Sequence, residues 1–198
     1  HFEALLGLTN LASVDDATKN RITSEKGGVR ALEYLQFSDH ELVRRAATEC
    51  MTNLLPHPKV VEHLRDPEKI KLWVGFSEDY EADFPTARAA AGALAMAVGL
   101  DDEELTETLV NKSACIRAFV GLLSCGHPEL VHRAGVGITY LADIPHAVTK
   151  LKKEGAVSAL KKLVKAAKKD PTKWAAVQGV VAGALEAVEA AKEADPSE

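Results

Sequence analysis

The segment MTNLL, residues 51–55, recurs along the chain at a nearly constant interval. Related segments are LTNLA (8–12), LAMAV (94–98) and ITYLA (138–142), and successive starts of the four are 43, 43 and 44 residues apart. A fainter copy, ALEAV (184–188), follows 46 residues later. A fixed period of this length is typical of a repeat protein, in which each unit buries its apolar face against its neighbours.

A second pattern lies between these copies, with an apolar residue at every third position. Its four versions are Val29/Leu32/Leu35, Ile70/Trp73/Phe76, Ile116/Phe119/Leu122 and Val157/Leu160/Leu163. Two versions match closely, GGVRALEYL (27–35) and GAVSALKKL (155–163), and each follows a short charged segment. Glycine tolerates positive φ, so a cap or tight turn between helices is predicted at Gly27 and Gly155.

Helix starts are predicted at SDHEL (38–42), DDEEL (101–105) and HPEL (127–130), which supply capping residues and acidic first turns. Strand alternation and hairpin dipeptides are missing. Three helices in about 40–47 residues favour armadillo repeats, whereas two would indicate HEAT repeats. The predicted fold is therefore an all-α, right-handed superhelical armadillo-repeat solenoid of about four to five three-helix repeats. A non-repetitive helical bundle is the alternative.

The predicted organisation is a single array over residues 1–198. The chain opens with HFEALLGL, without Met and within an expected helix, so we interpret it as a fragment of a longer protein. The approximate repeats are 1–13 (partial), 14–55, 56–98, 99–142 and 143–190.

The segment RAATECMTNLL (45–55) combines the composition of a buried helix with a polar row, because Arg45, Glu49 and Asn53 share one side at i, i+4 and i+8. Equivalent positions give one row in each long helix. These rows are Phe2/Leu6/Asn10, Arg45/Glu49/Asn53, Arg88/Gly92/Met96, His132/Val136/Tyr140 and a faint Gln178/Ala182/Glu186. Side by side, such rows would line a concave surface.

We predict that this surface is a groove that binds a partner. The candidate residues are Asn10, Arg45, Glu49, Asn53, Arg88, Met96, His132, Arg133 and Tyr140. Asn offers a donor and an acceptor to an extended backbone, Arg offers a planar fork to carboxylates, and Met and Tyr accept apolar anchors. The alternative is that Arg45 and Glu49 only pair with each other on a solvated helix.

Composition is that of an ordinary soluble folded protein, with 46% hydrophobic and 27% charged residues and a net charge of −5. Nine Lys against two acidic residues in 150–173 make this region strongly basic and the remainder acidic. Arg is absent there, so we expect no nucleic-acid partner; the lysines would keep a terminal repeat soluble or attract an acidic surface. The apolar runs are too short to span a membrane, and no membrane partner is expected.

No catalytic residue, metal site or cofactor is predicted. Neither GxGxxG nor GxxxxGK[ST] occurs. The histidine pairs His57/His63 and His127/His132 lack metal-ligand spacing, and Cys125 beside His127 lacks an orienting acid. The run DDEE (101–104) is interpreted as a solvated helix start. The three cysteines, Cys50, Cys115 and Cys125, are expected to be reduced and buried, as in a cytosolic protein.

Several longer segments carry a more specific pattern: FEALLGLTNLAS (2–13), VRRAATECMTNLL (43–55), KIKLWVGFSEDYE (69–81), ARAAAGALAM (87–96) and VHRAGVGITYLA (131–142). These segments resemble the UCS domain, the myosin-directed chaperone module of animals and fungi. Met96 and Tyr140 depart from the Asn expected in their rows, VNKSACIRAF lacks an expected aromatic residue, and the Lys-rich region matches loosely.

The resemblance implies a non-enzymatic cytoplasmic chaperone whose armadillo groove holds a myosin motor domain during folding and assembly. It also implies Hsp90 as a second partner, through a TPR domain that this sequence lacks. The alternative function is an armadillo adaptor that binds an extended peptide or a folded partner unrelated to myosin. Such an importin-like groove would need Trp four residues before Asn10 and Asn53, where none occurs.

Overall fold

A computed structural model describes residues 1–192, and every regular element in that range is helical. The elements are α1 (Phe2–Ala12), α2 (Asp16–Ser24), α3 (Gly28–Leu35), α4 (Glu41–Leu54), α5 (Pro58–Leu64), α6 (Pro67–Glu78), α7 (Phe84–Val98), α8 (Glu103–Glu107), a π-helical turn η1 (Thr108–Lys112), α9 (Cys115–Leu122), α10 (Pro128–Leu141), α11 (Pro145–Lys153), α12 (Ala156–Lys169), α13 (Pro171–Trp174) and α14 (Gln178–Ala190). They form two compact units, His1–Thr108 and Leu109–Glu198.

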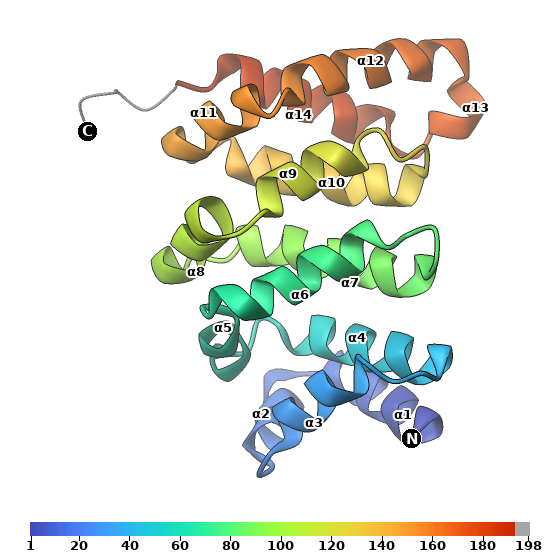
Figure 1. Ribbon diagram of the computed structural model, residues 1–198, viewed down its shortest axis with the longest axis vertical. Coiled ribbons are helices and arrows are strands. Elements are labelled where there is room, and N and C mark those ends of the chain that lie inside the picture. Colours follow the sequence, from blue (N-terminus) through green and yellow to red (C-terminus); the bar gives the residue numbers. More distant parts are fainter. Residues whose placement is uncertain (193–198) are drawn as a thin grey trace. The chain divides into compact units, whose positions relative to one another are not determined.

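The first unit has two layers of helices. Helices α1, α4 and α7 lie side by side, while α3 packs on α4 and α6 packs on α7, as Figure 1 shows. Small residues on the long helices, among them Ala46, Ala47, Ala90 and Ala91, are almost completely buried. Their size lets neighbouring backbones approach closely, which explains the abundance of alanine in these helices.

The second unit is built around α10, which contacts α9 and α14, while α12 covers α14. Two glycines of α10 make the close approach possible. A Cβ atom at Gly135 would lie 2.6 Å from the Val180 side chain, and one at Gly137 would lie 2.5 Å from the buried Phe119 ring. The α9–α10 and α10–α14 contacts therefore depend on residues without a side chain.

The turns predicted at two glycines are confirmed. Gly27 has φ 78° and Gly155 has φ 86°, both in the left-handed region, and each directly precedes a helix. The capping prediction holds only in part. Asp102 accepts a hydrogen bond from the Leu105 amide at the start of α8, but His40 and His127 precede α4 and α10 without any side-chain cap.

Two shorter helices and then a long helix recur in the first unit. Helices α2 and α3 have 9 and 8 residues before the 14 of α4, and α5 and α6 have 7 and 12 before the 15 of α7. The second unit contains an additional short helix, α13, which starts at a proline and is capped by Asp170. Periodicity did not indicate this helix, since its only buried residue is Trp174. The repeat limits stay predictions.

Candidate partner-binding surface

The predicted row residues of the first unit all lie outside its core. Asn10 and Met96 are exposed, and Arg45, Glu49, Asn53 and Arg88 are half-buried. They come from α1, α4 and α7, the three helices of one layer, on the side that the α3 and α6 layer does not cover. The polar side of α4 therefore reaches solvent, although Ala46, Ala47, Cys50 and Met51 make the same helix part of the core.

An ion-pair cluster connects α4 with α7 on this surface. Arg45 Nε lies 3.0 Å from Glu49 Oε1 within α4, and Arg88 Nη2 of α7 lies 3.8 Å from the same oxygen. The pairing considered as the alternative to a groove is thus present. It neutralises Glu49 with two guanidinium groups, so the surface has an excess of positive charge at this point.

Asn53 is committed to a neighbouring helix rather than freely displayed. Its amide nitrogen donates a hydrogen bond to the Thr9 carbonyl oxygen of α1 at 3.0 Å. This bond uses one of the two amide N–H groups, and the binding of a partner chain by Asn53 stays a prediction. The side-chain bond instead connects α1 to α4 at the level of the row.

Two threonines make equivalent links one repeat apart. Thr9 Oγ1 donates to the Ala46 carbonyl at 3.2 Å, and Thr52 Oγ1 donates to the Ala89 carbonyl at 3.5 Å. Each hydroxyl also contacts the carbonyl four residues earlier in its own helix. Sequence reasoning missed these links, although the TN pair in both repeated segments carried the signal.

The second unit carries the other predicted row residues on α10. His132 and Arg133 are half-buried, and the Tyr140 side chain is exposed, with 47% of its surface accessible. Arg133 Nη1 donates to the Glu129 carbonyl one turn earlier, at 3.0 Å. That all nine residues line one groove stays a prediction.

Long-range salt bridges join consecutive parts of the first unit. Arg44 Nε lies 2.6 Å from Asp83 Oδ2, and Arg65 contacts Asp102 at 2.7 Å and Glu104 at 3.2 Å. Both aspartates are also N-caps, of α7 and α8. Burial alone would raise the pKa of Asp83, but hydrogen bonds from Arg44 and Thr86 outweigh burial and hold the pKa below its ordinary value. Each arginine thus fixes the start of a later helix.

The side chains considered for metal or nucleophilic chemistry have structural contacts instead. His57 Nδ1 accepts the Lys59 amide at the start of α5, and its Nε2 lies 2.9 Å from Asn20 Oδ1. The Cys125 sulfur contacts the backbone of His127 rather than its imidazole. Within residues 1–192, no group of three His, Cys, Asp or Glu side chains is arranged to hold a metal ion.

All three cysteines are free thiols. Burial raises the pKa of Cys50 to about 11 and that of Cys115 to about 12, so both are inert core residues, as predicted. Cys125 is only half-buried, contrary to the prediction, because it lies in the turn before α10 rather than on an apolar helix face.

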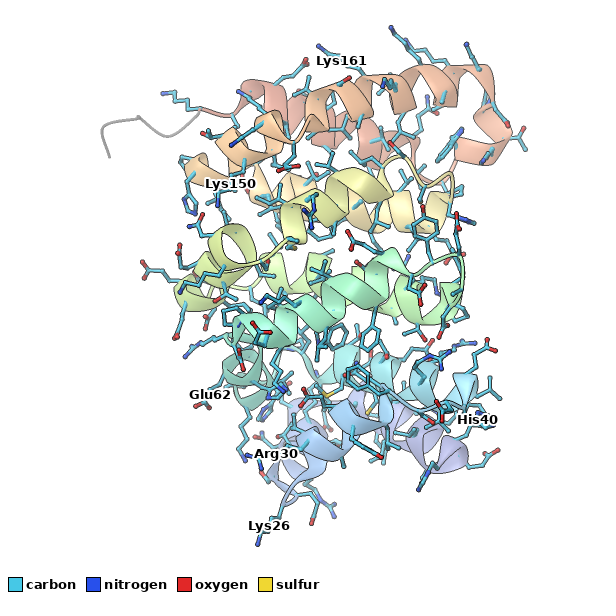
Figure 2. All side chains as sticks on the ribbon, viewed as in Figure 1. Lys26, Arg30, His40, Glu62, Lys150 and Lys161 are labelled. Carbon is cyan, nitrogen blue, oxygen red and sulfur yellow. The ribbon has the colours of Figure 1, made fainter. Side chains whose placement is uncertain are left out.

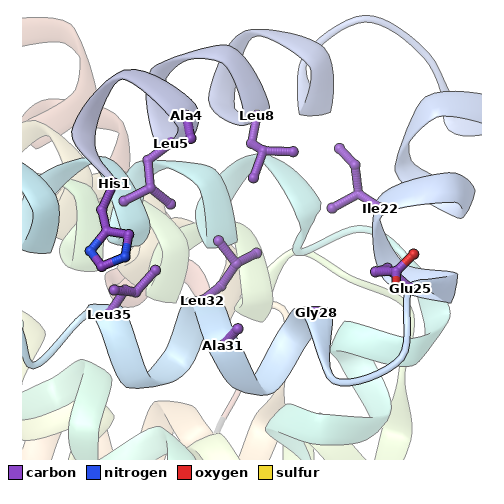
Figure 3. A pocket seen from close by; sticks show the side chains of 10 residues that line it. All are labelled: His1, Ala4, Leu5, Leu8, Ile22, Glu25, Gly28, Ala31, Leu32 and Leu35. Carbon is purple, nitrogen blue, oxygen red and sulfur yellow. The ribbon is translucent and has the colours of Figure 1, made fainter.

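An apolar pocket of about 230 Å³ lies between α1 and the α2–α3 hairpin, seen from close by in Figure 3. Leu5, Leu8, Ile22, Leu32 and Leu35 form most of its wall. His1 and Glu25 are the ionisable residues that line it, at opposite ends of the view. The wall offers few polar groups that could orient a specific ligand.

The lysine-rich region lies on α11 and α12. The Lys150 ammonium donates hydrogen bonds to the Val110 carbonyl at 2.9 Å and to the Asn111 side chain. Lys162, Lys165 and Lys169 are exposed along α12. Figure 2 shows Lys161 directed away from the helices, where its ammonium lies 2.7 Å from Glu189. None of the helices described over 1–192 is long and apolar enough to cross a bilayer.

The sequence and the fold are similar to those of known proteins. No protein-family model matches the sequence. Zebrafish protein unc-45 homolog B is 35% identical over 152 residues, which are 76% of this chain but only 16% of the relative. UNC-45 from Drosophila melanogaster superposes with a TM-score of 0.80 at 29% identity, over 95% of this chain and 23% of that structure.

Two further solved structures have a similar fold. One is a structure of the UNC-45 chaperone, described under the words "molecular features of the UNC-45 chaperone critical for binding and folding muscle myosin". It has a TM-score of 0.73 at 29% identity, over 95% of this chain and 20% of that chain. A designed armadillo repeat protein in complex with the peptide (KR)4 has a TM-score of 0.77 at 23% identity, over 94% of this chain and 74% of its own, which shows a shared fold alone.

The fold is thus that of an armadillo-repeat protein, as predicted. More particularly, the chain belongs to the UNC-45 family and corresponds to a piece of its UCS region. It spans about a sixth of the zebrafish relative's length.

Proposed function

We propose that the chain is a chaperone module that binds the motor domain of a myosin through the row residues on its long helices. Two kinds of observation support the proposal. The relatives are UNC-45 proteins, one of which is described as binding and folding muscle myosin. The exposed side of α1, α4 and α7 presents charged, amide and apolar groups on rigid helices, which suits recognition of a partner.

The observation that carries the site is the cluster on α4 and α7. The contacts of Arg45 and Arg88 with Glu49 orient both guanidinium groups on this surface. A carboxylate of the client would meet guanidinium donors in fixed positions, and Met96, about two turns further along α7 in the same row, would contact an apolar neighbour. Binding of this kind needs neither a cofactor nor catalysis.

The test is suppression of the heat-induced aggregation of a purified myosin motor domain, followed by light scattering. A variant with Arg45, Asn53 and Tyr140 replaced by Ala should protect markedly less than the parent chain. The matched control replaces Arg30, Lys71 and Val14, three exposed residues outside the row, by Ala. Equal protection by both variants would argue against the row as the client site.

The same experiment separates the alternative function. A chain that binds short peptides in an array screen but leaves motor-domain aggregation unchanged would be an adaptor rather than a chaperone. Action in the cytoplasm and cooperation with Hsp90 are further parts of the proposal. They are tested by co-purification of myosin and Hsp90 with a full-length protein that contains this segment.

A further inference from the structure

A second surface of the first unit combines exposed aromatic rings with uncompensated negative charge. Two segments, 34–42 and 76–84, contain Tyr34, Phe37, Phe76, Tyr80 and Phe84. These are five of the ten aromatic residues of the chain, concentrated in two stretches of nine residues. The same stretches contain six carboxylates and no Lys or Arg. We call residues 34–42 and 76–84 the acidic aromatic edge.

Large apolar side chains of this edge are open to solvent. Tyr34 is 78% exposed, Phe37 52% and Leu42 41%. Phe37 meets Phe76 with ring centroids 5.4 Å apart, so the end of α3 and the end of α6 form one continuous aromatic surface. Exposed aromatic groups that touch across two elements are typical of an interaction surface.

The edge is also held rigidly. Arg44 donates to the Ser38 carbonyl at 2.8 Å in the first turn and to Asp83 at 2.6 Å in the second. One half-buried guanidinium thus fixes both turns, which lie on the right in Figure 1, with His40 of the first turn at the margin in Figure 2. A surface that is ordered before binding loses little conformational entropy when a partner docks.

The charge around the rings defines the partner. Asp39, Glu41, Glu78, Asp79 and Glu81 are all exposed, and none is in an ion pair within residues 1–192. Asp83 already pairs with Arg44. Lysine or arginine side chains beside an apolar anchor would therefore be attracted, while an anionic lipid surface would be repelled.

The armadillo fold itself does not require this composition. The corresponding nine residues of the second unit, LLSCGHPEL (122–130), contain no Phe, Tyr or Trp and a single carboxylate, Glu129. The turn between α12 and α14 carries Trp174, but that ring is 7% exposed and Lys173 lies over it. The edge is thus a property of one part of the array rather than of the repeat.

We propose that the acidic aromatic edge docks a basic amphipathic helix of a partner protein, whose apolar residues cover Tyr34, Phe37 and Phe76. Lysines or arginines that flank this apolar face would lie over the exposed carboxylates. Tyr34, Phe37 and Phe76 lie at or just after the ends of α3 and α6, so this partner and a client on the row residues of α1, α4 and α7 would occupy different surfaces of the unit.

The test uses the full chain and a fluorescent synthetic helix of about 16 residues with Leu and Phe on one face and Lys on the other. Anisotropy should show binding, and the peptide with Glu in place of Lys should bind at least about tenfold more weakly. Replacing both Tyr34 and Phe37 by Ser should weaken binding of the Lys peptide by about tenfold or more. Replacing both Leu11 and Val14 by Ser removes two exposed apolar side chains elsewhere and should leave binding unchanged.

A charge series completes the test. The triple change Asp39→Asn, Glu78→Gln and Glu81→Gln should weaken binding and flatten its salt dependence, whereas Glu3→Gln, Asp101→Asn and Glu103→Gln should not. Unchanged binding after Tyr34→Ser and Phe37→Ser would overturn the proposal. So would equal affinity for the Lys and Glu peptides, or self-association of the chain that those two substitutions abolish. Far-ultraviolet circular dichroism of every variant controls for folding.

Discussion

The contact between Gly137 of α10 and Phe119 of α9 gives the sharpest prediction about packing. A Cβ atom at Gly137 would lie 2.5, 2.7 and 3.0 Å from three atoms of the Phe119 ring. That ring is completely buried and cannot turn away from the new methyl group. Gly137→Ala should therefore force the ring and its neighbours to move.

The magnitude follows from two opposing effects. In a helix interior, Gly→Ala by itself gains about 1 kcal/mol. Overpacking of a filled core costs about 1–3 kcal/mol. Because the new methyl group would contact three ring atoms, we expect a cost of about 3 kcal/mol at this site. The net expectation is a loss of about 2 kcal/mol, equivalent to a fall of about 4–8 °C in Tm for a chain of this size.

The assay is urea denaturation followed by circular dichroism, with Gly183→Ala as the matched control. Gly183 also lies inside a helix, α14, but a Cβ there would meet nothing within 4 Å, so that variant should gain stability. Phe119→Leu should relieve part of the cost, giving a double-mutant coupling of about 1 kcal/mol or more. Stability of Gly137→Ala at or above that of the parent would refute the packing argument.

Three further predictions concern charge, thiols and turns. Asp83 has a lowered pKa, so its contribution to stability is complete above its ordinary value of 3.8 and is lost as pH falls through the folded-state pKa. Asp83→Asn should cost about 2 kcal/mol at pH 7 and make the free energy of unfolding less pH-dependent below about pH 4. If the Asn variant kept the acid sensitivity of the parent, Asp83 would not be its source. Iodoacetamide at pH 8 should label Cys125 well before Cys50 and Cys115, as read by mass spectrometry, and equal labelling of all three in the native protein would contradict their burial. Gly155→Ala should lose about 1 kcal/mol because φ is 86° there, whereas an unchanged unfolding midpoint would mean that the turn relaxes freely.

The repeat was predictable because apolar periodicity reports which side of each helix enters the core. The turns at Gly27 and Gly155 and the exposure of the Arg45 row follow from the same reasoning. Partners across helices were not predictable in this way. The bond from Asn53 to Thr9 depends on how closely α4 approaches α1, which is set by small residues on both helices rather than by the polar pattern.

The acidic aromatic edge shows the same limit. Its two segments are separated by about one repeat in sequence, and the contact between Phe37 and Phe76 depends on how the two turns, which Arg44 bonds to each other, lie in space. A helix-face count treats turn residues as connectors, so it assigns them no surface. A search for clustered aromatic and acidic residues at the repeat interval would have found them.

Hydrogen exchange of the chain with and without a myosin motor domain tests the central claim most directly. Client binding should slow exchange of α4 and α7 peptides that contain Arg45, Asn53, Arg88 and Met96, while α2 and α5 should be unaffected. Protection confined to other helices, or no protection at motor-domain concentrations that suppress aggregation, would contradict the account.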